Sequence, residues 1–313
     1  MGFDLKKITR GRKTMPNRVL LYGMDGCGKT TTACGAPAPF VIDANKGAHR
    51  FDVQRYVPET FAEAGEAIEA CIRGDIKCET IVLDTISDLE AMSHKEMFPD
   101  SNVADWGGGW GKGDQEAIAR WREFVLRLER AWLAGKHIVL VAHVTVKAFA
   151  DPMGATYDRF EVAARPRLAG LLRGWCDFVC FCREDVATQK VDGKERARTT
   201  GVRSMYTQRS AAFDAKARGT SLFPPKLLLS WRDLASAIAA DDDRAASMRK
   251  EIDGMLAELG DAGLTAKVTE FLRMNPNAVV ESHNRVSSLL EEKKKTPEAI
   301  PSEKAKEHVN VQG

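Results

Sequence analysis

The sequence lacks long hydrophobic runs, a large net charge and internal repeats. No apolar segment approaches the roughly 18 residues that a membrane span requires, so no membrane partner is expected. The 46 basic and 44 acidic residues leave a formal net charge of only +2 among 313 residues, so overall charge does not argue for a nucleic-acid partner. No apolar segment follows the basic N-terminus, so a secretory signal is not expected there.

Disulfide and zinc patterns are absent as well. The seven cysteines are odd in number, and their spacing fits no disulfide scaffold, which predicts a reducing compartment such as the cytoplasm. Three of them lie in the segment CDFVCFC (176–182), and no second Cys/His pair stands at zinc spacing. Buried thiols on a strand are therefore predicted there.

Short apolar runs alternate with segments of helical periodicity over the first half of the chain. Strands are predicted at residues 17–23, 39–43, 79–85 and 136–144, and helices at 58–74, 87–98 and 115–135. Thr60 and Ser87 are expected to cap two of these helices, and Gly135 to end the third. The alternation predicts an α/β fold with a mostly parallel central sheet flanked by helices.

Composition divides the chain into four regions. A flexible basic leader (1–17), an α/β domain (18–240), a charged helical module (241–290) and a disordered polar tail (291–313) are predicted. Within the second region, residues 145–163 have the character of a polar loop, 164–175 that of a helix and 191–195 that of a hairpin turn.

One segment matches a phosphate-binding motif in full. Residues 23–30 fit the pattern G-x-x-x-x-G-K-[ST], after a predicted strand and before the start of a helix. The glycines let successive backbone N–H groups point at phosphate oxygens, and the helix N-terminus adds partial positive charge. Lys29 would reach the β- and γ-phosphates of ATP, and the Thr30 hydroxyl would bind Mg²⁺. Nucleotide contacts are expected from Gly23, Met24, Asp25, Gly26, Cys27, Gly28, Lys29, Thr30 and Thr31.

Two further residues stand at the ends of predicted strands. Asp84 closes the apolar run TIVLD and is expected at the carboxyl edge of a parallel sheet, beside the phosphate-binding loop. There it would hold Mg²⁺ with Thr30, although an acid in this position could instead cap the following helix. His143 ends the fourth strand at the same edge, where it could sense the γ-phosphate or serve the structure alone.

In this order, Gly23–Thr30, Asp84 and His143 resemble the arrangement of RecA-fold ATPases. More closely, the chain resembles the phage-encoded AAA-type nucleotide-binding proteins linked to single-strand annealing and recombination. The resemblance covers about residues 15–240. It rests on GKTTTACGAPAPFVID, FDVQRYVPET, TIVLDTISDLE, GWGKGD, IVLVAHVTVKAF, YDRFE and SAAFDAKARGTSLFPPKLLLSW. It implies a RecA-like P-loop ATPase domain over residues 18–240, with ATP and Mg²⁺ as cofactors, in a homo-oligomer in the host cytoplasm.

The resemblance also assigns roles outside the phosphate loop. In RecA-like proteins a Lys/Arg pair on a late strand reaches the γ-phosphate bound by the neighbouring subunit, and Lys216 and Arg218 stand where that pair is expected. Two cations spaced i, i+2 share a strand face and would stabilise the charge that develops in phosphoryl transfer. Asn45 occupies the place of an expected water-activating glutamate. An amide can orient water but cannot accept its proton, so slow hydrolysis is predicted.

Two segments with interleaved aromatic and basic residues are expected at the ligand edge of the sheet. Such patterns suit single-stranded DNA, because rings stack on bases while cations meet phosphates. In RecA-like proteins the loop after the fourth strand contacts DNA. The candidates are Trp110 and Lys112 in the first segment, and Lys147, Tyr157, Arg159 and Phe160 in the second.

The predicted function is an ATP-binding, slow, DNA-dependent ATPase in phage recombination or single-strand annealing. Its partners would be single-stranded DNA and a single-strand-binding or annealing protein. The alternatives are a motor or helicase-loader ATPase, and a nucleotide-dependent switch whose loops bind a protein. A small-molecule kinase is disfavoured because no arginine-rich lid is found. A partitioning ATPase of the deviant type is disfavoured because Met24 and Asp25 stand where it would carry an extra lysine.

Overall fold

The computed structural model describes residues 14–109, 111–191, 194–275 and 278–295. Its contacts divide the chain into two compact units. The larger is an α/β unit within residues 12–219 and 223–240, and the smaller is a helical unit that includes residues from 241 onward.

The α/β unit is built on a twisted, mostly parallel sheet. Its strands are β1 (Arg18–Gly23), β2 (Pro39–Asp43), β3 (Gln54–Tyr56), β4 (Thr80–Asp84), β5 (His137–Ala142), β8 (Phe178–Val191), β9 (Lys194–Tyr206), β10 (Lys216–Ala217) and β11 (Lys226–Leu228). Their order is β11-β9-β8-β1-β5-β4-β2-β3, with β10 paired to β8. The strands from β8 to β3 run parallel, whereas β9, β10 and β11 pair antiparallel with their neighbours. The predicted fold class is confirmed.

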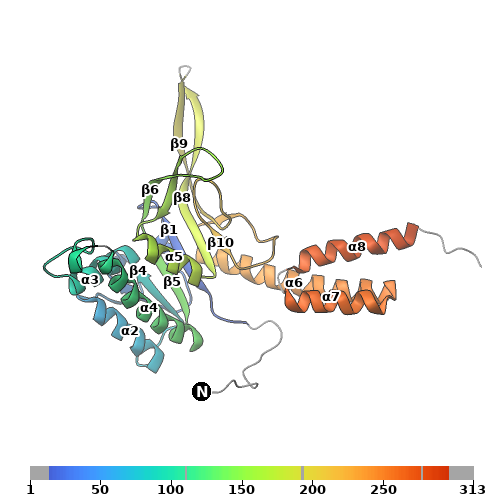
Figure 1. Cartoon of the computed structure of the whole chain (residues 1–313), viewed down its shortest axis with the longest axis horizontal. Coiled ribbons are helices and arrows are strands. Elements are labelled where there is room, and N and C mark those ends of the chain that lie inside the picture. The colour runs from blue at the N-terminus through green and yellow to red at the C-terminus, as the bar shows by residue number, and fades with distance from the viewer. Residues whose placement is uncertain (1–13, 110, 192–193, 276–277, 296–313) are drawn as a thin grey trace, which may run out of the picture. The chain divides into compact units, whose positions relative to one another are not determined.

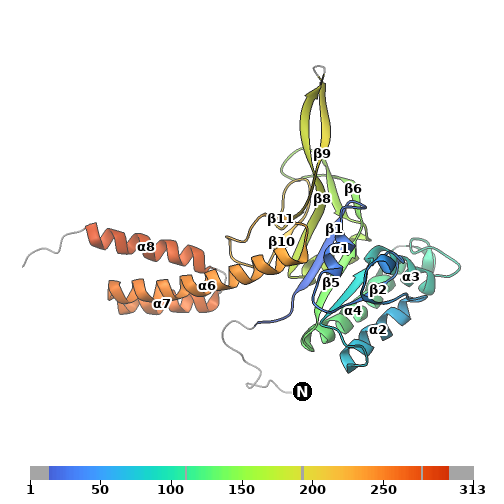
Figure 2. The ribbon, with the colours of Figure 1, turned by 180° about the vertical axis from the view of Figure 1, so that it is seen from behind.

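Helices cover both faces of this sheet. They are α1 (Lys29–Cys34), α2 (Phe61–Arg73), α3 (Ile86–Met97), α4 (Lys112–Leu133), α5 (Pro166–Trp175) and the start of α6 (Trp231–Leu259), with short 3-10 turns η2 (Ala48–Arg50) and η3 (Trp106–Gly108). Side chains alternate between the faces of a strand. Leu20 of β1 therefore packs in the core beneath α2 to α5, and Leu21 in the core shared with α1 and α6. Figure 1 looks onto the face that α4 and α5 cover, and Figure 2 shows α1 on the opposite face.

Several local predictions can be compared with the observed elements. Thr60 caps α2 and accepts a hydrogen bond from the Glu63 backbone N–H, as expected. The predicted cap Ser87 is wrong: Thr85 caps α3, and the Ser87 hydroxyl donates to the Ala163 carbonyl instead. Residues 145–163 are not a loop, because β6 (Val144–Phe149) and β7 (Tyr157–Val162) pair there as an antiparallel hairpin.

The cysteine-rich segment behaves as an apolar strand. Cys180 and Cys182 lie on β8 and are fully buried, and Cys176 is buried just before it. Burial raises the pKa of the Cys180 thiol to about 12, so this group stays protonated at neutral pH. No cluster of three His, Cys, Asp or Glu side chains suited to a metal occurs in the part of the chain that the structure describes. The predicted buried thiols are confirmed.

The helical unit has a small apolar core of its own. It consists of the later part of α6 with α7 (Ala262–Met274) and α8 (Val279–Lys295). Ile252, Val279 and Val286 are buried among these helices. Because α8 continues to Lys295, the predicted disordered tail begins too early at 291, and residues 296–313 lie outside the described part. None of the described helices is both long and apolar enough to cross a bilayer.

Candidate nucleotide-binding site

The phosphate-binding loop connects the end of β1 to the start of α1, as the motif requires. Its glycines have specific structural reasons. A Cβ added to Gly23 would lie 1.8 Å from the Cys182 carbonyl oxygen on the neighbouring strand, so only glycine fits where β1 meets β8. Gly28 has a φ of +108° and forms the N-cap of α1, a conformation that side-chain-bearing residues rarely adopt. The loop is thereby shaped to turn its amides toward one point.

Lys29 is buried at the base of this loop. Its ammonium group donates hydrogen bonds to the carbonyl oxygens of Gly23 at 2.9 Å and Met24 at 2.8 Å. Both bonds hold the charge close to the loop amides, where anionic phosphate oxygens are bound in sites of this kind. Lys29 also interacts electrostatically with the Asp84 carboxylate. Because the ammonium group is buried, little of its charge is screened by water, which favours an anion nearby.

Thr30 and Asp84 come together as the sequence predicts. The Thr30 hydroxyl donates to Asp84 Oδ2 at 2.6 Å, although the two residues are 54 positions apart. Asp84 is fully buried, and its other oxygen, Oδ1, has no hydrogen-bond partner in the described structure. Burial raises the pKa of Asp84, and the nearby Asp43 carboxylate adds to the increase, while the Thr30 bond opposes it. A buried carboxylate oxygen without a partner beside a hydroxyl fits a Mg²⁺ site.

The turn after β2 separates the roles of Asp43 and Asn45. Asp43 is buried and accepts hydrogen bonds from the backbone N–H groups of Gly47 and Ala48, at 2.9 and 3.1 Å. Asp43 therefore holds the turn, which leaves it poorly placed to activate water in place of a glutamate. Asn45 is exposed and lines the same cavity as Lys29 and Asp84. Its amide oxygen also accepts from the Gly47 N–H at 2.8 Å.

His143 lies between β5 and β6 and reaches the phosphate loop. Its Nδ1 is 2.6 Å from Asp25 Oδ1, so the end of β5 is tied directly to the motif. Asp25 is largely exposed in this pair, and the His143 side chain is about one-third exposed, at 38%. This link connects the loop that cradles phosphate to the β6–β7 hairpin, which starts at the next residue.

These groups surround one cavity of about 270 Å³. Asp25, Gly26, Gly28, Lys29, Thr30 and Thr31 contribute from the motif, whereas Met24 is half-exposed and Cys27 packs into the core. The other lining residues are Asn45, Asp84, Thr85, Val141, His143 and Arg203. Arg203 of β9 was not predicted. The only signal in the sequence was Gly201 within a strand pattern, which is typical of a bulge next to a site.

A family model described as an AAA domain matches residues 15–219 of the chain. The chain belongs to this AAA-domain family. Its α/β unit is accordingly a nucleotide-binding P-loop NTPase domain of the AAA type. The crystal structure of the RadB recombinase is similar over 61% of this chain and 80% of its own, with 14% identity and a TM-score of 0.36. No curated protein matches the sequence.

Lys216 and Arg218 of the AAA domain lie far from its own phosphate loop. Lys216 pairs with Val179 at the start of β8, whereas Gly23 pairs with Cys182 further along the same strand. Lys216 donates to the Arg173 carbonyl at the end of α5, and Arg218 pairs with Asp177 at 2.9 Å. Since both stand at the opposite edge of the sheet, neither can act on the nucleotide of its own chain.

The predicted DNA-binding residues divide into exposed and packed groups. Lys147 is exposed on β6, and Tyr157 is half-buried opposite Phe149, with ring centroids 5.5 Å apart. Arg159 is buried and paired with Asp214, and Phe160 stacks on Phe181 in the core. For these last two the predicted DNA contact is corrected, because packing already occupies their side chains.

Side chains of the glycine-rich segment before α4 contact residues close to them in the chain. Lys112 is the first residue of α4, and its ammonium group donates to the Gly107 carbonyl at 3.1 Å. Trp106 packs on Phe98, with ring centroids 5.2 Å apart. Trp110 lies outside the described residues. Lys112 therefore stays a candidate for contact with DNA, and the prediction for Trp110 is untested.

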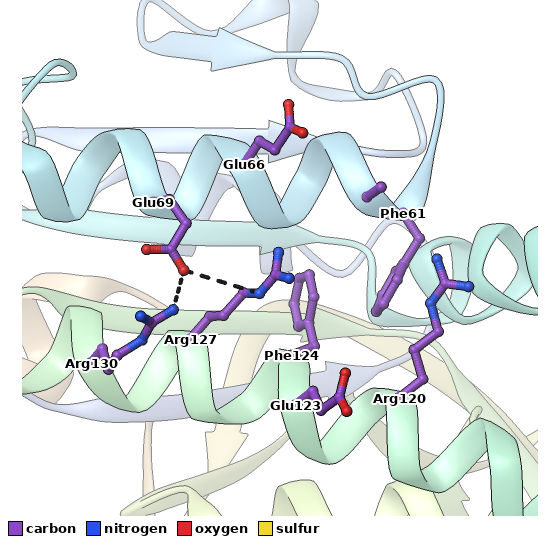
Figure 3. A pocket seen from close by; sticks show the side chains of 9 residues that line it. Phe61, Glu66, Glu69, Arg120, Glu123, Phe124, Arg127 and Arg130 are labelled. Atoms are coloured by element: carbon purple, nitrogen blue, oxygen red, sulfur yellow. Dashed lines mark hydrogen bonds and ion pairs between the residues drawn. The ribbon is translucent and has the colours of Figure 1, made fainter.

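A larger hollow of about 410 Å³ between α2 and α4 has a different character. Figure 3 shows Arg127 and Arg130 both directed at Glu69, with which they form ion pairs. Phe61 and Phe124 form its apolar floor and stack at 4.5 Å. The hollow carries charges of both signs, and Glu69, Arg127 and Arg130 are paired with one another. It therefore has no concentration of positive charge that would attract a phosphate. The chemistry of the smaller cavity therefore identifies the site.

Proposed function

We propose that the protein binds Mg²⁺–ATP in the cavity around Lys29 and hydrolyses it slowly. The observation that carries this proposal is the bond between Thr30 and Asp84, which leaves one buried carboxylate oxygen without a partner among the described residues. Thr30 and Asp84 would hold the metal, and Lys29 with the loop amides would hold the phosphates. The metal, when bound, would offset the negative charge on the β- and γ-phosphates.

Slow turnover follows because Asn45 occupies the place of the expected water-activating glutamate. Asn45 can orient water but cannot take its proton, and Asp43 is committed to the backbone of its own turn. General-base assistance contributes typically about 10²- to 10⁴-fold to a rate, so its loss slows hydrolysis without preventing nucleotide binding. His143, held by Asp25, would report the presence of the γ-phosphate to the β6–β7 hairpin.

The same proposal extends to single-stranded DNA in phage recombination or strand annealing. Lys147 is exposed on the hairpin that follows His143, so a change at the γ-phosphate would reach a basic surface directly. Lys216 and Arg218 would act on the nucleotide of a neighbouring copy, which requires a homo-oligomer. A single-strand-binding or annealing protein would be a further partner. A protein-binding switch is the alternative that a failure to bind DNA would favour.

Asp84→Asn tests the metal site. Calorimetry is expected to show magnesium-dependent ATP uptake by the wild-type protein, and a rise of about 10- to 100-fold in Kd for the variant. Without magnesium, the two proteins are expected to bind ATP alike. Asp52→Asn, an exposed aspartate outside the cavity, serves as the matched control. Wild-type protein that takes up no ATP with magnesium would contradict the proposed function as a whole.

The same variant is expected to change the pH dependence of stability without nucleotide. Because burial raises the pKa of Asp84, the folded state binds more protons than the unfolded state between the ordinary and the raised pKa. The free energy of unfolding therefore falls as pH rises through that interval, and the loss is complete above the raised pKa. Denaturant titrations between about pH 4 and pH 7 are expected to show a smaller decline for Asp84→Asn. Equal declines would contradict the raised pKa of Asp84 in the folded state.

Lys147→Ala tests the DNA surface. Fluorescence anisotropy with a labelled single strand is expected to show weaker binding by about 3- to 10-fold at low salt, and a salt slope smaller by about one. Lys77→Ala, an exposed lysine before β4, is expected to leave both unchanged. Preference for single strands over duplex that depends on Mg²⁺–ATP would support recombination or annealing. Wild-type protein that binds neither form at low salt would favour the switch.

A further inference from the structure

Arg203, on β9, lines the nucleotide cavity. An irregularity in β9 allows its side chain to reach that cavity. In the β8–β9 ladder, Glu184 pairs with Arg203 and Val186 with Thr199, so three residues of β9 stand opposite one of β8. Gly201, in this bulge, has a φ of +77° and donates its N–H to the Glu184 side chain at 3.1 Å. Bulges of this kind turn side chains away from the regular alternation and are common beside active sites.

The guanidinium of Arg203 lies at the start of α1. Its Nη1 is 3.4 Å from the position that a Cβ on Gly28 would take, and the side chain lines the same cavity as Lys29. Within the described part of the chain, Arg203 has no ion pair, although Glu184 stands opposite it on β8. Among the described residues, therefore, no carboxylate is paired with its charge.

Arg203 and Asp84 approach the cavity from opposite sides. Along the sheet, β8 and β9 lie on one side of β1, and β5 and β4 on the other. The metal ligands Thr30 and Asp84 therefore face one side of a bound phosphate chain, and Arg203 faces the other. A planar guanidinium with several donors suits phosphate oxygens that a metal does not contact.

We infer that Arg203 is a phosphate-binding residue of the nucleotide site of its own chain, on the side away from the metal. This inference rests on the proposed ATP site and adds a cation that the phosphate-binding motif does not contain. A purely structural role is already performed by its backbone, whose carbonyl accepts from the Leu229 N–H at 2.9 Å. In the described part of the chain this exposed side chain has no hydrogen bond or ion pair, which leaves it available to a phosphate oxygen.

Arg203→Ala tests this role by calorimetry with Mg²⁺–ATP, Mg²⁺–ADP and magnesium-free ATP. We expect the Kd for each to rise by about 10- to 100-fold, because the contact does not depend on the metal. Arg203→Lys is expected to recover part of the loss. Arg198→Ala, an exposed arginine on the same strand beyond the bulge, is expected to bind all three like the wild type.

Competition with tripolyphosphate distinguishes the phosphate from the rest of the nucleotide. Arg203→Ala is expected to lose affinity for this probe by the same factor as for ATP. Loss for ATP alone would overturn the inference, because it would place the contact on the base or the ribose. Unchanged binding of all ligands by Arg203→Ala would also overturn it while leaving the proposed function intact. Wild-type protein that binds no Mg²⁺–ATP would overturn both.

Discussion

Lys29→Ala is expected to raise the Kd for Mg²⁺–ATP by about 10²- to 10⁴-fold and to remove ATP hydrolysis. Charge-assisted hydrogen bonds contribute about 1.5–3 kcal/mol each, and this ammonium group would form such bonds to two phosphates. In the structure the Lys29 ammonium group is already held at the loop by the carbonyls of Gly23 and Met24. It can therefore reach bound phosphates without a rearrangement of the loop. Calorimetry and a phosphate-release assay measure the two effects.

The folded state is not expected to weaken strongly in this variant. Two hydrogen bonds are lost, but a buried positive charge is removed with them, and these effects oppose one another. Lys77→Ala is the control for removal of a lysine in general, because this exposed residue lies outside the cavity. If Lys29→Ala were folded and bound Mg²⁺–ATP as the wild type does, the phosphates could not lie in this loop.

Asn45→Glu is expected to increase the rate of ATP hydrolysis by about 10²-fold. The position lines the cavity and is exposed, so a longer carboxylate side chain can enter without disturbing the core. A carboxylate there can accept the proton of an attacking water, which the amide cannot. The increase is expected in kcat, measured by phosphate release under saturating ATP with and without single-stranded DNA.

Asn45→Gln separates charge from side-chain length. It has the reach of glutamate but no proton-accepting group, so it is expected to hydrolyse ATP no faster than the wild type. An equal acceleration by both variants would mean that reach, and not basicity, limits the rate. A wild-type turnover that is already fast and is unaffected by Asn45→Ala would rule out the slow-ATPase hypothesis.

The metal site illustrates a conflict between function and stability. Asp84 is buried next to a second buried acid, Asp43, with which it pairs in register between β4 and β2. One of its oxygens has no partner within the described structure, and an unpaired buried polar atom typically costs about 1–3 kcal/mol. A bound cation would remove this cost. Nucleotide and magnesium are therefore expected to stabilise the AAA domain against unfolding.

The sequence alone determined the phosphate-binding motif and the fold class of the domain that carries it. The spacing of Gly23, Gly28, Lys29 and Thr30 specifies a loop conformation through short-range geometry, and the apolar run before Asp84 specifies a buried strand that ends at the ligand edge. Both patterns are local, so they can be recognised without knowledge of the rest of the fold. Helix caps were predicted less well. Thr85, and not Ser87, caps α3, because neighbouring hydroxyls compete for the same N–H groups.

Only the tertiary structure decided which distant cations face the nucleotide. Lys216 is predicted to act on the nucleotide of a neighbouring subunit, and the pairing of β10 with the start of β8 places it away from the phosphate loop of its own chain. Arg159 looked suited to DNA, but the fold buries it against Asp214. Arg203 gave no signal of its own and reaches Gly28 because a bulge shifts β9 relative to β8. Strand order and register are set by contacts between residues far apart in the chain, which local patterns do not encode.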